Sequence, residues 1–276
     1  MSSLSEEVTR YAAVVVTGGS SGIGKSFIEL IATVHPGVLI CNLSRRVPDI
    51  NLSQLNLRHV PCDLSKHESL SAGAAEVLRI LKDEAPAGPV LLINNSGFGA
   101  YGVFPEPDLA HQLEMMDVNM RAVVDFTGRL LPCLKTRSGA IITVASTAAF
   151  QPTPYLAAYG ATKAFVLHWS LALNEELRGS GVRTLAVCPG PTSTEFFRRA
   201  GLKQGSVADS LGQTTEEVVR ESLHALARGK AQVVTGWKNK VMAAFSAKLP
   251  KPWVARISAK VLARWRLSKV APGGCS

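Results

Sequence analysis

The chain has 276 residues, 46% of them hydrophobic, and a formal net charge of +9. Residues 1–276 therefore fit a single domain that can bury a large core, without a linker. No apolar run reaches the roughly 18 residues of a membrane-spanning helix, and the polar residues 1–10 argue against a secretory signal. Five scattered cysteines favour a reducing compartment such as the cytoplasm, and six histidines without metal-ligand spacing indicate no metal site.

Short apolar runs alternate with segments of helical periodicity along the first 235 residues. This alternation predicts an α/β, Rossmann-type fold, in which right-handed crossovers form a doubly wound parallel sheet with helices on both faces. Seven strands are expected, near 12–17, 38–43, 58–62, 90–95, 139–146, 182–188 and 231–235. Helices are expected near 22–34, 66–84, 107–117, 119–135, 157–179 and 214–228.

A glycine-rich turn joins the first expected strand to the first helix. Backbone N–H groups at such a helix start, aided by the helix dipole, bind a pyrophosphate. Ser20 and Ser21 add hydroxyl donors, although the spacing differs from the usual Gly-x-Gly-x-x-Gly of dinucleotide sites. An ordinary glycine-rich turn is the alternative interpretation. The turn reads Thr17-Gly18-Gly19-Ser20-Ser21-Gly22-Ile23-Gly24.

Tyr159 and Lys163 are four residues apart in an expected helix, so their side chains lie on the same face. A nearby ammonium lowers the pKa of a tyrosine, which brings this weak acid closer to the working pH. Ser146, upstream at the end of a strand, belongs to the same candidate site. The pattern predicts a proton-donating site, and an exposed helical Tyr-Lys pair is the alternative.

The candidate residues fall at the carboxyl ends of the expected strands, which is where doubly wound sheets bind their ligands. One edge of the sheet should therefore collect all of them. They are Thr17, Ser44, Asp63, Asn95, Ser146 and Pro189.

With these motifs, the sequence resembles the short-chain dehydrogenase/reductase family over about residues 11–235. The resemblance is to the subgroup with the Thr-Gly-x-x-x-Gly-x-Gly loop and the Tyr-x-x-x-Lys site. The family usually has alanine at the position of Ser96, and serine is small enough to admit the cofactor. The further matching motifs are Asn94-Asn95-Ser96-Gly97, Asp117-Val118-Asn119 and Pro189-Gly190.

The resemblance implies a role for each catalytic candidate. Ser146 would bind the carbonyl oxygen of the substrate and Tyr159 would protonate it. Lys163 would lower the pKa of Tyr159 and bind the nicotinamide ribose, and Asn119 would anchor a water that passes protons to the lysine. Ser146 as a strand-end cap and Asn119 as a helix N-cap are the alternatives.

The resemblance also implies the cofactor contacts. Asp63 and Leu64 would flank the adenine, and residues 95–97 would line the ribose. Thr192 and Thr194 match contacts to the carboxamide and phosphates, or cap the next helix. The expected cofactor site comprises Gly18, Ser20, Ser21, Gly22, Ile23, Gly24, Ser44, Arg45, Arg46, Asp63, Leu64, Asn95, Ser96, Gly97, Tyr159, Lys163, Pro189, Gly190, Thr192 and Thr194.

Charge at the end of the second strand predicts which dinucleotide binds. NAD sites usually place an acid about 20 residues after the glycines, to hold the ribose 2′-hydroxyl. Here Arg45 and Arg46 occupy that region and no acid follows until Asp49. Because a guanidinium binds a phosphate bidentately, the sequence predicts NADP(H). A solvated basic turn is the alternative.

Two segments, residues 98–104 and 194–211, are expected to overhang the cleft. Their aromatic and apolar residues favour a hydrophobic carbonyl substrate, which could be a 3-oxoacyl chain, a steroid or a xenobiotic ketone. The predicted function is an NADPH-dependent reductase. The alternatives are alcohol dehydrogenation, the reverse reaction, and a non-catalytic NADP(H)-binding sensor or scaffold; the intact set of catalytic residues favours an enzyme.

Basic residues concentrate at the C-terminal end. No acid follows Glu221, whereas eleven Lys and Arg residues lie between Arg228 and Lys269. Apolar residues at helical spacing predict a basic amphipathic helical extension over about residues 237–269 that attaches peripherally to an anionic membrane surface. A lid over the cleft and a structural helix packed on the domain are the alternatives. No nucleic-acid-binding motif is present, and homo-oligomerisation is left open.

Overall fold

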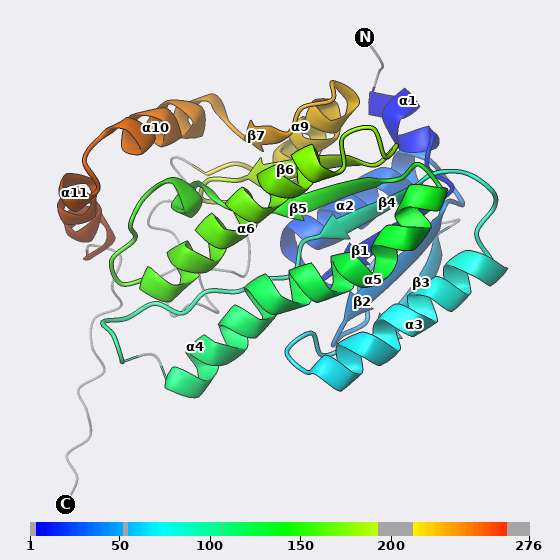
Figure 1. The fold of residues 1–276 in the computed structure, drawn as a ribbon, viewed down its shortest axis with the longest axis horizontal. Helices are drawn as coiled ribbons and strands as arrows, with labels where there is room; N and C mark the ends of the chain where they lie inside the picture. The colour runs from blue at the N-terminus through cyan, green and yellow to red at the C-terminus, as the bar shows by residue number, and fades with distance from the viewer. Residues whose placement is uncertain (1–3, 52–54, 107, 193–211, 264–276) are drawn as a thin grey trace, which may run out of the picture.

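The computed structural model describes residues 4–51, 55–106, 108–192 and 212–263, and it contains one seven-stranded parallel sheet (Figure 1). The strand order is β3-β2-β1-β4-β5-β6-β7, as expected for a doubly wound sheet. Each expected strand exists, with bounds within two residues of those expected. The strands are β1 (Ala13–Thr17), β2 (Leu39–Ser44), β3 (Asn56–Pro61), β4 (Val90–Asn94), β5 (Ala140–Val144), β6 (Arg183–Cys188) and β7 (Gln232–Val234).

Helices cover both faces of the sheet (Figure 1). Successive side chains of a strand point to opposite faces, so β1 contributes to two cores. Val14 and Val16 pack with Phe27 on one face, whereas Val15 packs with Phe126 on the other. The helices are α2 (Gly22–Val34) and α9 (Thr215–Ala227) on one face, and α3 (His67–Asp83), α4 (Leu109–Met116), α5 (Ala122–Thr136) and α6 (Ala157–Glu176) on the other.

Three local features differ from the expected elements. A short helix, α1 (Leu4–Thr9), precedes β1, and its buried Glu7 forms an ion pair with Arg183 at 2.6 Å. The expected break between two helices near residue 118 is wrong, because a π turn, η1 (Asp117–Arg121), joins α4 and α5. Such π turns are frequent at functional sites. A 3₁₀ turn, η2 (Thr147–Phe150), follows β5.

The C-terminal extension forms two helices, α10 (Trp237–Lys248) and α11 (Lys251–Ala263), beyond the β7 edge of the sheet (Figure 1). Most of their large apolar side chains do not pack on the domain: Trp237 is 71% exposed, Phe245 67% and Trp253 63%. The alternative of a structural helix with its apolar stripe buried is therefore wrong for these residues. Among the described helices, none is long and apolar enough to cross a membrane.

Candidate active site

A cleft of about 810 Å³ runs along the carboxyl ends of the strands. Its walls come from the glycine loop, the ends of β2 to β6, and helices α10 and α11. The sheet order places β2 and β3 on one side of β1 and β5 and β6 on the other. The cleft therefore has a nucleotide side, near Arg45 and Asp63, and a substrate side, near Ser146 and Tyr159.

The glycine loop is held open at the start of α2. Gly18 and Gly22 have positive φ angles of 72° and 57°, which side chains other than glycine rarely adopt. Ser21 is the N-cap of α2 but its side chain makes no capping hydrogen bond. The first N–H groups of the helix therefore remain available to a phosphate, and this arrangement fits a dinucleotide.

Asn95 ties the end of β4 to this loop. Its Nδ2 atom donates to the carbonyl oxygens of Thr17 at 3.0 Å and Gly18 at 3.1 Å. In return, Thr17 Oγ1 accepts hydrogen bonds from the N–H groups of Asn95 and Ser96. A further bond that the sequence did not indicate joins the N–H of Gly19 to Asn42 Oδ1 at 2.8 Å.

Gly24 leaves no room for a side chain, because a Cβ atom there would overlap Asn95 Nδ2 and the Gly18 carbonyl oxygen. We expect Gly24→Ala to displace the loop and lower the affinity for NADP(H) by about tenfold or more, equivalent to about 1.4 kcal/mol. Gly128→Ala is the matched control, since it is also helical and has nothing within 4 Å of its Cβ position. Cofactor titration of both variants measures the difference, and equal affinities would contradict the tight-cradle interpretation.

The nucleotide side carries the expected basic residues at the end of β2. Ser44, Arg45 and Arg46 line the cleft, as do Asp63 and Leu64 after β3. Arg45 Nη1 lies 3.4 Å from the Glu114 carboxylate of α4. Burial raises the pKa of Asp63, but hydrogen bonds from Ser65 and the charge of Arg45 outweigh burial and leave that pKa below its usual value.

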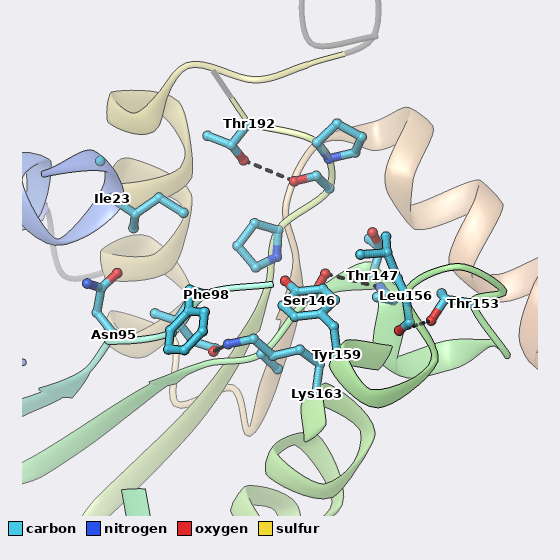
Figure 2. Close-up of a pocket in the computed structure, with 18 of the residues that line it drawn as sticks. Ile23, Asn95, Phe98, Ser146, Thr147, Thr153, Leu156, Tyr159, Lys163 and Thr192 are labelled. Atoms are coloured by element: carbon cyan, nitrogen blue, oxygen red, sulfur yellow. Dashed lines mark hydrogen bonds between the residues drawn. The ribbon is translucent and has the colours of Figure 1, made fainter. Parts of the chain in front are cut away.

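On the substrate side, Ser146 follows β5 and faces Tyr159 and Lys163 of α6 (Figure 2). Tyr159 makes a side-chain hydrogen bond with Ser146. Lys163 Nζ donates to the Val144 carbonyl oxygen at 2.8 Å. Ser146 also accepts a hydrogen bond from the Ala148 N–H, so it caps η2 as well as lining the cleft. Ser146 and Tyr159 thus meet in the cleft, and the Lys163 ammonium lies farther away, 6.0 Å from the Tyr159 ring centroid.

Burial shifts both titratable groups. It raises the pKa of Tyr159 to about 12, although the hydrogen bond with Ser146 acts in the opposite direction. It also lowers the pKa of Lys163 to about 8, an effect that Cys188 opposes. The expected lowering of the Tyr159 pKa is therefore wrong for this structure. Lys163 Nζ lies 6.0 Å from the Tyr159 ring centroid, and desolvation of the phenol is the largest cause of the raised pKa.

Asn119 is fully buried on the π turn and is not a helix N-cap. Its amide donates to the Phe98 carbonyl oxygen and to Thr162 Oγ1, both at 3.0 Å. It also accepts a hydrogen bond from the Phe98 N–H. A Cβ atom at Gly97 would lie 3.1 Å from both Asn119 Oδ1 and Lys163 Nζ. Asn119 therefore lies near the lysine and fixes the loop after β4 against α6.

The loop after β6 lines the cleft with Pro189, Gly190 and Thr192. Thr192 Oγ1 donates to the Gly190 carbonyl oxygen at 3.0 Å. Thr194 and the expected overhanging segment 194–211 lie outside the described residues. The described site residues that line the cleft thus lie together at the carboxyl edge of the sheet, as expected.

A family model described as short chain dehydrogenase matches residues 12–205. The chain belongs to the short-chain dehydrogenase/reductase family. It is accordingly an NAD(P)-binding oxidoreductase that acts on CH–OH groups.

Relatives of this dehydrogenase/reductase resemble it along most of its length. The uncharacterized oxidoreductase YbbO of Escherichia coli K12 is 31% identical over 87% of this chain and 83% of its own. The serine 3-dehydrogenase of Rhizobium radiobacter is 29% identical over 76% of this chain and 89% of its own. A short-chain dehydrogenase from Sphingobium yanoikuyae, solved in complex with NADPH, superposes with a TM-score of 0.69 at 25% identity, covering 95% of this chain and 98% of that one.

The sequence did not indicate most of the apolar wall of this dehydrogenase/reductase cleft. Phe98 lies in a segment that was expected to overhang it, whereas Leu156, just before α6, was not singled out. Helices α10 and α11 also contribute to the wall, and the sequence assigned their apolar residues to a membrane surface, with a lid over the cleft as an alternative. Their helical periodicity was visible in the sequence, but periodicity does not reveal which structure a helix lies against. The residues involved are Met242, Phe245, Leu249, Val254, Ile257, Val261 and Leu262.

Proposed function

We propose that this enzyme is an NADPH-dependent reductase that converts a hydrophobic ketone into the alcohol. One observation carries the proposal: Tyr159, hydrogen-bonded to Ser146 and one helical turn from Lys163, faces a cleft whose substrate side has an apolar wall. A protonated phenol there is placed to act as a general acid on a substrate oxygen.

Each of the four candidate catalytic residues has its own role in the reaction. A reduced nicotinamide bound in the cleft would supply the hydride that the carbonyl carbon of the substrate accepts. Ser146 donates a hydrogen bond to the carbonyl oxygen and so stabilises the negative charge that develops on it. Tyr159 transfers its hydroxyl proton to that oxygen. Lys163 in its ammonium form stabilises the tyrosinate that remains, and Asn119 keeps the lysine and the loop after β4 in position.

Arg45 and Arg46 support NADPH over NADH. Both line the nucleotide side of the cleft, and the carboxylate that NAD sites use for the ribose is missing from the end of β2. Arg45 pairs with a partly exposed Glu114, at 3.4 Å, and a 2′-phosphate can displace that weak pair. The relative from Sphingobium yanoikuyae, solved in complex with NADPH, agrees with this preference.

The lining residues support an apolar substrate. On the substrate side they include Phe98, Leu156, Met242 and Phe245, and among the described lining residues Lys163 is the only charged group there. The serine 3-dehydrogenase relative is named for a zwitterionic substrate. Among the described lining residues on this side of the cleft, no arginine is available to bind a carboxylate, so we favour a fatty, steroidal or xenobiotic ketone over an amino acid.

Oxidation of an alcohol is the second candidate, because the serine 3-dehydrogenase relative is named for that direction. The same residues serve both directions, with Tyr159 accepting a proton instead of donating one.

A non-catalytic sensor is disfavoured by the intact catalytic set. Attachment of residues 237–269 to an anionic membrane, a cytoplasmic location and homo-oligomerisation also stay predictions, and no nucleic acid is proposed as a partner.

The pH dependence follows from Lys163. Its ammonium form is needed, and its pKa lies at about 8. We expect kcat/KM for reduction to fall as the pH rises through about 8, because the lysine loses its proton while Tyr159, with a pKa of about 12, keeps its own. A profile that is flat from about pH 7 to 10 would contradict this role for Lys163.

A substrate screen tests the proposal. The full chain is mixed with NADPH or NADH and a series of ketones of increasing apolar size, and the absorbance of the reduced nicotinamide is followed. The oxidised cofactors and matching alcohols, serine included, form the second arm. Reduction of apolar ketones with NADPH supports the proposal, whereas turnover of serine alone would overturn the substrate class.

A further inference from the structure

Helix α10 presents an apolar and basic surface away from the domain. Its buried side chains are small or polar, namely Asn239, Ala243 and Ser246. At 3.6 residues per turn, Trp237, Val241 and Lys248 lie on the opposite side, and all three are exposed.

Helix α11 repeats the same composition. Val254, Ser258 and Leu262 are buried, and the opposite side carries Trp253, Arg256 and Lys260. Each helix therefore exposes one tryptophan together with basic side chains. We call these six exposed residues the outer face: Trp237, Val241, Lys248, Trp253, Arg256 and Lys260.

Between the outer face and the buried residues, both helices line the cleft. The side chains concerned are apolar and yet remain 42% to 67% exposed. They form a rim around the substrate side of the cleft, open to the surroundings. This apolar rim consists of Met242, Phe245, Leu249, Ile257 and Val261.

The two helices are fixed to the domain rather than suspended from it. Asn239 packs against Gly190, where even a Cβ atom would overlap its amide, and donates to the Thr235 carbonyl oxygen at 2.9 Å. Tyr101 donates its hydroxyl hydrogen to the Leu262 carbonyl oxygen at 2.6 Å. The outer face and the rim therefore hold a set position relative to the active site.

Charge indicates what covers the outer face. Among the described residues, Lys240 pairs with Glu221 at 3.3 Å, but no ion pair is formed by Lys248, Arg256 or Lys260. A symmetric contact between two copies would bring these like charges together, which disfavours a second copy as the occupant. An anionic lipid surface attracts such lysines and arginines, and tryptophan prefers the membrane interface.

We propose that the outer face docks on an anionic lipid surface, so that the apolar rim opens the cleft toward the lipid and an apolar substrate enters from it. The membrane-anchor and lid interpretations of this segment then describe two sides of the same pair of helices. The delivery step rests on the proposed function, because it assumes a hydrophobic carbonyl substrate, whereas the docking step does not.

Flotation of the full chain with vesicles tests docking without any turnover. Vesicles of phosphatidylcholine alone are compared with vesicles that also contain phosphatidylserine, at low and high salt. We expect flotation with the anionic vesicles, reduced by salt. Trp237→Ser with Trp253→Ser, and separately Lys248→Gln with Arg256→Gln and Lys260→Gln, should each lower the bound fraction, the charge variant by about tenfold or more.

The matched control removes three positive charges elsewhere, with Lys82→Gln, Lys135→Gln and Lys230→Gln, and should float as the parent chain does. Equal flotation of parent and outer-face variants would overturn the proposal, as would no flotation by the parent. A dimer of the parent chain that the double tryptophan variant dissociates, without flotation by either, would assign the face to a second copy and also overturn it.

Activity measurements distinguish delivery of the substrate from docking on the lipid surface. The double tryptophan variant should reduce a water-soluble ketone as fast as the parent, but reduce a long-chain ketone held in anionic vesicles several-fold more slowly. Equal rates on the vesicle-held ketone would overturn delivery. Failure to reduce any ketone, with the flotation pattern intact, would refute the proposed function and leave docking supported.

Discussion

Replacing Tyr159 by phenylalanine should lower the rate of ketone reduction by about 10²–10⁴-fold, which is the typical contribution of a general acid. Phenylalanine keeps the ring, which is buried beside Leu156 and Met115, and removes only the hydroxyl group. The fold and the binding of NADP(H) should therefore survive. The hydrogen bond with Ser146 is lost, but Ser146 still caps η2 through the Ala148 N–H.

Tyr155→Phe is the matched control for this experiment. Tyr155 belongs to the same apolar cluster and contacts the Tyr101 ring, but it does not line the cleft with Tyr159. Its variant should keep nearly full activity. Single-turnover rates measure the chemical step, and cofactor fluorescence measures binding. If the Tyr159→Phe variant reduces an apolar ketone at a near-normal rate, Tyr159 is not the proton donor.

Ser146 is a less suitable residue for the same test. Its side chain lines the cleft and also accepts the Ala148 N–H at 3.1 Å, so Ser146→Ala would remove a substrate contact and the cap of η2 together. A loss of activity could then come from a displaced 3₁₀ turn. The tyrosine variant isolates the hydroxyl group more cleanly, because every buried contact of the ring is retained.

The strands and the glycine loop could be predicted from the sequence because each depends on local pattern. A fully buried parallel strand such as β1 needs a short continuous apolar run, and Gly18 and Gly22 adopt positive φ angles that favour glycine. The alternation of strands and helices predicted the topology, and the topology predicted that the ligand binds at the carboxyl ends of the strands. Tyr159 and Lys163 then faced the cleft because residues four apart share a helical face.

Other features depend on tertiary packing and left little signal. Glu7 is buried in α1 because Arg183 of β6, 176 residues away, compensates its charge. The π turn at Asn119 fixes the loop after β4 through the Phe98 backbone, which no local periodicity records. In α10 the sequence showed the apolar stripe, but it did not indicate that the small or polar residues Asn239, Ala243 and Ser246 would be the ones buried on the domain.

Removing both arginines at the end of β2 should change the cofactor preference of the enzyme. Arg45→Ala together with Arg46→Ala should lower the affinity for NADPH by about 10²-fold, because charge-assisted hydrogen bonds contribute about 1.5–3 kcal/mol each. Exposure of the Arg45 side chain, which is 64%, lets solvent screen part of this effect. NADH lacks the 2′-phosphate, so its affinity should change by about twofold or less.

A variant at Glu114 tests the same assignment in the opposite direction. Its carboxylate lies 3.4 Å from Arg45 Nη1, so NADPH must compete with it for the guanidinium. We expect Glu114→Gln to strengthen NADPH binding modestly while leaving NADH unchanged, the opposite of the arginine variant. Dissociation constants for both cofactors, measured on the three proteins at one salt concentration, decide the matter. Equal losses of NADPH and NADH in the arginine variant would show that Arg45 and Arg46 shape the loop rather than bind the 2′-phosphate.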